Sequence, residues 1–171
     1  LDLIKPGKLD FMLLLPMFPK GKDNLRSMAV AGCDGENYGK IIIYDFPKGE
    51  LVFGPAQINA MINQDPAIAR EFTLWDQTGS SVVKGTMTIL LVENSVFFIQ
   101  PVYLKATSRV KIPELQRIIM SEGRVAVMKT SLEEAYMEIQ QRAQKDIRRS
   151  QGPLPRQSLA PEAQATPENQ D

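Results

Sequence analysis

The chain has 171 residues, of which 43% are hydrophobic and 23% charged, values typical of a globular protein with a buried core. Twenty basic residues balance twenty acidic ones, so no net positive charge attracts nucleic acid, which is not expected as a partner. The sequence has no histidine and one cysteine, Cys33. This excludes histidine-dependent catalysis, His-ligated metals, Cys-cluster metal sites and an internal disulfide.

The first third of the chain contains three apolar segments. Residues 9–15 (LDFMLLL) end at Pro16 and do not alternate with polar residues, a pattern that suits a strand covered on both faces. Residues 25–30 fit either a short helix or a strand. Residues 40–46 (KIIIYDF) predict a strand, because isoleucine and tyrosine favour extended backbone. A glycine-rich segment, residues 31–39, predicts a tight loop before that strand.

Two helical turns are predicted over residues 55–71. Pro55 suits the first turn of a helix, and Asp65 is placed to cap a second segment that begins at Pro66. Residues 74–80 then predict a turn-rich link.

Residues 81–106 predict a long β-hairpin, with residues 93–95 as its turn. Alternation in the first arm predicts one shared face for four apolar residues: Val83, Met87, Ile89 and Leu91. Proline has no N–H to donate, so Pro101, together with Gly85 opposite, predicts a bulge or an edge in this hairpin.

A second hairpin is predicted from residues 115–120 and 124–128, although the first of these segments also fits a helix. A helix follows over residues 131–149, where Ser131 and Glu134 match the capping-box pattern. Its apolar stripe fits either the sheet of its own domain or a partner helix, and the former is favoured. Residues 150–171 are rich in proline and glutamine and predict a disordered tail after a single domain at 1–149.

The expected fold is α+β, with helices at about 55–71 and 131–149 packed on one mostly antiparallel or mixed sheet. That sheet has about five or six strands and is built on the 81–106 hairpin. No catalytic, cofactor-binding or metal-binding residue is identified, and no cofactor is expected. A non-catalytic role is favoured, and enzymatic activity stays open.

The candidates for a ligand-binding surface are Asp34, Tyr38 and Trp75. Trp75 also fits a lid over the core, the commoner role of a single tryptophan. Oxygen atoms of Asp34, Glu36 and Asn37 could surround calcium, although a solvated turn is favoured. A serine–lysine pair, Ser80 or Ser81 with Lys84, is a further catalytic candidate. Cys33 has no histidine to activate it and is interpreted as a small apolar residue.

Several sequence blocks, in order between about Phe11 and Ala143, carry a resemblance: FMLLLPMFP, IIIYDFP, VFGPAQI, INQDP, FTLWDQTGS, QPVYLKA and PELQRIIM. Together they resemble the C-terminal soluble part of uncharacterised protein family 0182, which comprises large bacterial multi-pass membrane proteins. The resemblance implies a domain outside the bilayer, on the extracytoplasmic side of the cell membrane. It brings no known activity.

The chain starts with Leu1 and shows no signal or spanning segment, so we expect it to be a piece of a longer protein. The function that follows is a structural or interaction domain of a larger membrane protein. Its expected partners are the remainder of its own membrane-spanning chain, other envelope proteins or a second copy. The alternative is an accessory domain of a transporter or envelope enzyme whose active groups lie outside these residues.

Overall fold

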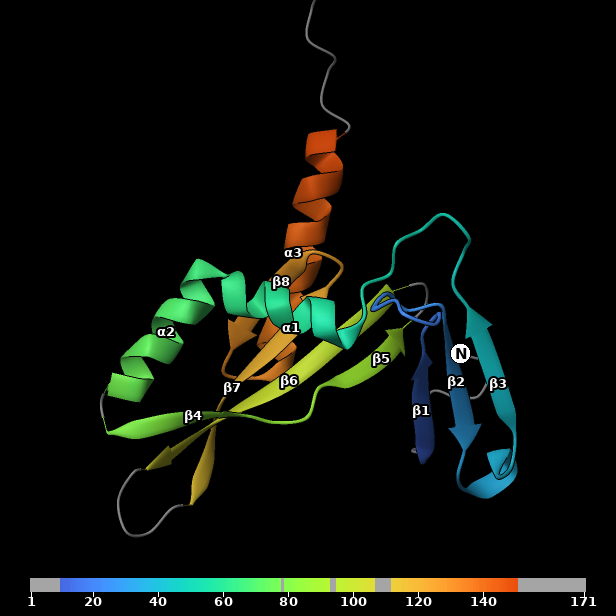
Figure 1. Ribbon diagram of the computed structural model, residues 1–171, viewed down its shortest axis with the longest axis horizontal. Coiled ribbons are helices and arrows are strands. Elements are labelled where there is room, and N and C mark those ends of the chain that lie inside the picture. The colour runs from blue at the N-terminus through green and yellow to red at the C-terminus, as the bar shows by residue number, and fades with distance from the viewer. Residues whose placement is uncertain (1–9, 78, 93–94, 107–111, 151–171) are drawn as a thin grey trace, which may run out of the picture.

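The computed structural model describes residues 10–77, 79–92, 95–106 and 112–150. These residues form eight strands in two antiparallel sheets together with three α-helices, so the predicted α+β class is confirmed (Figure 1). The strands divide between two sheets, whereas a single sheet was expected. Apart from Ser150, which ends the last helix, the predicted tail lies outside the described residues.

The first sheet has the order β1-β2-β3, in which β1 is Met12–Met17, β2 is Ser27–Gly32 and β3 is Ile41–Asp45. Residues 25–30 therefore contribute a strand rather than a helix, because β2 pairs on both sides. Pro16 does not stop the first strand. It lies within β1 opposite Met28, on an edge strand where the missing N–H disturbs the ladder least.

The second sheet is built on β6, Ser95–Ala106, which pairs with β4 (Ser80–Lys84), β5 (Thr88–Val92) and β7 (Pro113–Glu122). β8 (Val125–Lys129) pairs with β7 and completes the sheet, which confirms the second hairpin. The long hairpin at 81–106 is also confirmed, although its first arm consists of two strands, β4 and β5, instead of one.

The break between β4 and β5 lies at Gly85, opposite Pro101, where an irregularity was predicted. The Gly85 N–H donates to the Pro101 carbonyl at 2.8 Å, and a Cβ added at Gly85 would lie 2.7 Å from Pro101 Cγ. On the other side of β6, the pairing with β7 shifts register between Val102 and Tyr103. Proline and glycine therefore mark a bulge inside the central strand's ladder.

This break also corrects the predicted alternation. Ile89 and Leu91 are buried as expected, but Val83 is 38% exposed while Val82 packs against the core. Residues 85–87 are not in a strand, so the inward-facing phase changes by one residue between β4 and β5.

The helices are α1 (Pro55–Gln64), α2 (Pro66–Gln77) and α3 (Leu132–Ser150). Asp65 caps α2 as predicted, since its Oδ1 accepts the N–H groups of Ala67 and Ile68 at 2.9 and 3.0 Å. However, α2 continues through residues 74–77, which were predicted as a link, because no glycine or proline interrupts it after Pro66.

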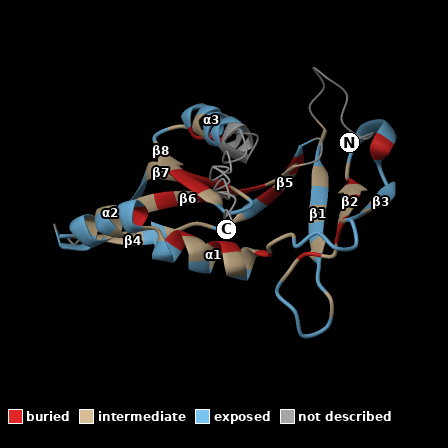
Figure 2. Ribbon diagram, turned by 90° about the horizontal axis from the view of Figure 1, so that it is seen from above, coloured by how far each residue is buried: buried red, intermediate tan, exposed pale blue. Residues whose placement is uncertain are grey.

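Helices cover both faces of the second sheet, with α1 and α2 on one face and α3 on the other (Figure 2). The larger core contains residues from α1, α2 and both sheets, among them Ile58, Ile62, Ile68, Phe98, Met28 and Val30. The smaller core joins Ala135 and Ile139 of α3 to Phe97, Met120 and Val127. The first sheet contributes side chains from only one of its faces, such as Met28 and Val30, to these cores.

Candidate functional site

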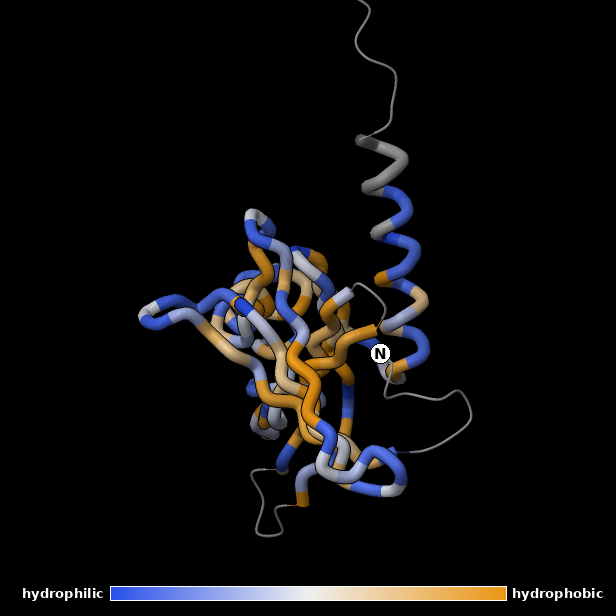
Figure 3. Tube along the Cα trace, turned by 90° about the vertical axis from the view of Figure 1, so that its right-hand side faces the viewer, coloured by the Kyte–Doolittle hydropathy of each residue, from blue (hydrophilic) through white to orange (hydrophobic). Residues whose placement is uncertain are grey.

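The outward face of the first sheet is apolar and exposed. We name it the β1–β3 face. Its apolar residues are Leu13, Leu15, Met17, Ala29, Ala31, Ile41 and Ile43, and the row of Met17 is completed by the polar residues Ser27 and Asp45. Leu13 and Leu15 are 61% and 59% exposed, and Ile41 and Ile43 are 69% and 58% exposed. Figure 3 is viewed from the side on which β3 lies, and hydrophobic residues run along the chain through the centre of this view.

The other face of the same sheet is covered by the molecule itself. Met28 and Val30 are almost fully buried, and Met12, Leu14 and Ile42 pack against the same core. Because side chains alternate along a strand, the residues between them point outward. In β1 and β3 those outward residues are mostly large and apolar, which is unusual on a solvated sheet face.

The aromatic residue Phe11 extends this apolar region at the start of β1. It lies two residues before Leu13, in the outward phase, and is 71% exposed. Phe18, just after β1, is in the inward phase and lies beside Gly54 and Pro55. Single exposed apolar residues are common, whereas a contiguous group of this kind marks a surface that contacts protein or membrane. The β1–β3 face is therefore the candidate functional site.

The three candidates predicted from the sequence do not come together. Asp34 and Tyr38 lie in the connection between β2 and β3, whereas Trp75 lies on α2 at the opposite end of the molecule (Figure 1). Asp34 accepts a hydrogen bond from the Phe11 N–H at 3.0 Å, and Tyr38 is 77% exposed. These residues remain predictions, and the fold holds Trp75 apart from the other two.

Trp75 has the surroundings of a core lid. It is partly buried against the larger core, and its ring centroid lies 6.0 Å from that of Phe72. The Arg117 guanidinium lies 5.5 Å from the Trp75 ring, in a cation–π arrangement. These contacts fasten α2 to the five-stranded sheet.

The acidic loop before β3 uses its oxygens within the chain. The Asn37 amide donates to Asp10 at 3.4 Å, and its Oδ1 accepts from Lys40 Nζ at 3.3 Å. Among the described residues, no three histidine, cysteine, aspartate or glutamate side chains are grouped as they would be around a metal ion. The loop's polar contacts hold the β2–β3 connection against the start of β1.

The serine–lysine candidates are engaged elsewhere. Ser80 Oγ donates to the Trp75 carbonyl at 2.6 Å, and Ser81 Oγ donates to the Lys105 carbonyl at 3.4 Å. Lys84 instead donates to Asn63 and lies 5.4 Å from the Phe72 ring. Partial burial lowers the pKa of Lys84, but no serine hydroxyl bonds to it.

Cys33 is partly buried, and its thiol donates weakly to the Ala31 carbonyl at 3.6 Å. This short-range contact is consistent with the small apolar role expected for this residue.

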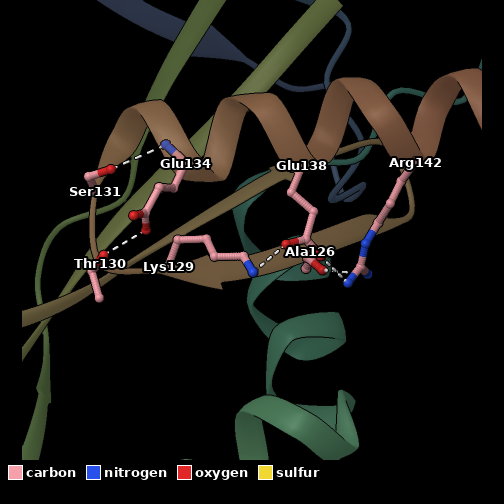
Figure 4. A network of polar contacts seen from close by, with 7 residues as sticks. All are labelled: Ala126, Lys129, Thr130, Ser131, Glu134, Glu138 and Arg142. Atoms are coloured by element: carbon pink, nitrogen blue, oxygen red, sulfur yellow. Dashed lines mark hydrogen bonds and ion pairs between the residues drawn. The ribbon is translucent and has the colours of Figure 1, made fainter.

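A polar network fastens the start of α3 to β8 (Figure 4). The Glu134 N–H donates to Ser131 Oγ at 3.2 Å, as the capping pattern predicted, and the Glu134 carboxylate accepts from Thr130 Oγ1 at 2.6 Å. Glu138 lies between Lys129 and Arg142 and pairs with both. The Lys129 hydrogen bond, helped by Arg142, lowers the pKa of Glu138, which is therefore anionic at neutral pH.

A cavity of about 230 Å³ adjoins this network between α2 and β8. Its charged lining residues include three acids, Asp65, Glu71 and Glu138, and two bases, Lys129 and Arg142. Glu138 already pairs with both bases. The charged groups are therefore suited to holding α3 against β8 and not to acid–base chemistry.

The described residues thus form a two-sheet α+β domain in which the apolar β1–β3 face is exposed. Residues 1–75 match the model of an uncharacterised protein family, UPF0182. The chain is 59% identical to a UPF0182 protein of Syntrophobacter fumaroxidans over 87% of its own length and 17% of that protein's. It is 56% identical to one of Nitrosococcus oceani, over 83% of this chain and 16% of the relative.

A UPF0182 protein of Trichlorobacter lovleyi is 43% identical over 95% of this chain and 18% of the relative. The resemblance to this family is confirmed, and the chain spans about one sixth of the length of these relatives. No solved structure matches the chain significantly. Within the described residues, no helix is both long and apolar enough to cross a membrane.

Sequence reasoning did not identify the β1–β3 face as a site, although a signal was present. The runs MLLL and III were interpreted as parts of strands, and the first strand was predicted to be covered on both faces. The structure covers one face of each strand. A strand that is apolar on both faces and covered on one is itself a sign of a missing partner.

Proposed function

We propose that this chain is an extramembrane structural or interaction domain of a larger bacterial membrane protein, and that it binds through the β1–β3 face. The exposure of Leu13, Leu15, Ile41 and Ile43 on one sheet face is the observation that carries the proposal. Removing apolar area from water contributes roughly 25 cal/mol per Å², so covering these side chains stabilises the complex with a partner.

The length of the relatives supports the part of the proposal that concerns a larger protein. In the Syntrophobacter fumaroxidans relative, the matched region takes up 87% of this chain and only 17% of the relative. This chain therefore corresponds to one portion of a longer polypeptide there. The membrane location and the extracytoplasmic side depend on the family resemblance. Antibodies raised against this chain should therefore detect a membrane-fraction protein several times larger than 19.1 kDa. A soluble product of about that mass would contradict the proposal.

A labelling experiment tests the side of the membrane. In the longer protein with Cys33→Ser, an added Glu133→Cys places a thiol on an exposed position of α3. We expect a membrane-impermeant maleimide to label it in intact spheroplasts. Labelling only after the membrane is permeabilised would place the domain in the cytoplasm.

Paired substitutions test the interaction surface in the longer protein. Leu15→Gln with Ile43→Thr makes the β1–β3 face polar, whereas Leu115→Gln with Ile112→Thr changes equally exposed residues elsewhere. We expect the first pair to lower the melting temperature and to speed proteolysis around this domain, and the control pair to change neither. Equal behaviour of the two pairs would overturn binding through this face.

A further inference from the structure

The β1–β3 face has a shape as well as a polarity. Cross-strand pairing places Ala31 between Leu13 and Ile41, and Ala29 between Leu15 and Ile43. Each row is therefore large, small, large. The outer strands form two ridges, and the central strand forms a shallow trough between them.

Packing of the described core does not account for the two alanines, because they lie on the other face of β2. Alanine is depleted in strands because it offers little side chain for cross-strand packing. The inward residues of the same strand, Met28 and Val30, are larger and lie in the core, so β2 is not short of space on that side. The small size of Ala29 and Ala31 therefore shapes the outward surface of the sheet and not its core.

The dimensions of the trough fit one α-helix. Strands lie about 4.8 Å apart, so the two ridges are separated by roughly 10 Å, which is also the usual distance between packed layers. An α-helix with its side chains is about 10–12 Å across. The β1 ridge from Phe11 to Met17 is about 20 Å long at strand spacing, which corresponds to a helix of roughly 13 residues. The β3 ridge is shorter: it consists of Ile41 and Ile43 and ends at Asp45.

Other occupants fit this face less well. An added strand would pair with the open edge of β1 or β3 and leave the trough uncovered. A second copy packed face to face would set ridge against ridge. If shifted by one strand, it would leave one outer ridge of each copy exposed.

The polypeptide that could supply a helix is present in the relatives. The chain corresponds to 17% and 16% of the length of two of them, so most of each relative lies outside the matched part. The family model covers residues 1–75, which contain all three strands of the β1–β3 face. This face therefore belongs to the part of the chain that the family model describes.

We infer that the β1–β3 face seats one amphipathic α-helix from the remainder of the same, longer polypeptide, lying along β2 over Ala29 and Ala31. This inference rests on the proposed function and adds the identity and the shape of the occupant. Such a helix would present apolar residues at positions i, i+3, i+4 and i+7 to the trough.

Photo-crosslinking in the longer protein in its native membrane tests the occupant. Leu13 or Ile41 is replaced by a benzophenone amino acid, and Leu115 serves as the exposed control. We expect intramolecular cross-links from the first two positions to one segment outside these 171 residues, with acceptors spaced by three or four residues. Cross-links between two copies, lipid adducts or acceptors spaced by two residues would each overturn the inference.

A trough-filling variant separates this inference from the proposed function. Ala29→Phe with Ala31→Phe keeps the face apolar but removes the trough, and Ala106→Phe is the control on an exposed strand position. We expect at least a tenfold lower cross-link yield from the double variant and no change from the control. If filling the trough has no effect while Leu15→Gln with Ile43→Thr abolishes cross-linking, the face binds but no helix is seated. If neither change has an effect, the proposed function fails too.

Discussion

β6 and β3 each contain a run of consecutive apolar residues, but the two runs have different surroundings. In β6, the neighbours Phe97 and Phe98 point to opposite faces and are each only 2% exposed. In β3, Ile42 packs on the core, whereas Ile41 and Ile43 on either side are 69% and 58% exposed. The five-stranded sheet receives α1 and α2 on one face and α3 on the other, and the three-stranded sheet receives a cover on one face.

This difference shows what an unbroken run of apolar residues indicates about the burial of a strand. Such a run indicates that both faces of a strand are to be buried, as in sheets covered by helices on both sides. The cover need not lie in the same stretch of sequence. For the five-stranded sheet the helices lie within this chain, and for the β1–β3 face we have proposed that the cover lies outside it.

The largest expected effect breaks the covered sheet. Ile119 is fully buried in β7, so Ile119→Ala in this chain should lower the free energy of unfolding by about 2–5 kcal/mol through lost burial and a cavity. The matched change in the other sheet, Ile43→Ala, should cost less than about 1 kcal/mol, because Ile43 is already exposed. Urea denaturation followed by circular dichroism measures both. Similar losses would show that the β1–β3 face is covered in this chain alone.

An intermediate effect should be confined to the three-stranded sheet. A Cβ at Gly32 would lie 2.1 Å from the Asn37 carbonyl oxygen, so Gly32→Ala should cost about 1–3 kcal/mol. A Cβ at Gly39 would have no neighbour within 4 Å, and the φ of Gly39 is +78°, so Gly39→Ala should cost only about 1 kcal/mol of backbone strain. Hydrogen exchange should rise more in β1 to β3 than in β6 to β8 for Gly32→Ala. A uniform rise would mean that the two sheets open as one unit.

The smallest effect concerns the polar contacts that hold α3, the helix that covers one face of the five-stranded sheet. Lys129 and Arg142 lower the pKa of Glu138 below its ordinary value of 4.5, so ionised Glu138 stabilises the fold at neutral pH. That contribution is lost as the pH falls from about 4.5 through the lowered pKa. Glu138→Gln should cost under about 1 kcal/mol at pH 7.

The pH and salt dependence of the Glu138→Gln effect give its control. The difference between the two proteins should disappear in acid, where the native carboxyl is protonated, and should shrink in 1 M salt, where surface charges are screened. A difference that is unchanged at low pH would attribute the effect to packing of the side chain instead of its charge.

The sequence by itself determined the local elements. β-branched runs predicted β3, proline and glycine predicted the irregularity at Gly85 and Pro101, and an apolar stripe with a capping pattern predicted α3. These features depend on neighbours a few residues away, which the sequence displays directly. It also indicated, through the LLL and III runs, strands that are apolar on both faces.

Only the tertiary structure decided how these elements meet. It divided the strands into two sheets. The break after β4 leaves Val83 facing outward, and Trp75 lies within α2 as a lid on the core. It also left Leu13, Leu15, Ile41 and Ile43 exposed together. A sequence pattern states how much burial a residue favours, whereas the partner that supplies the burial is set by contacts between distant segments.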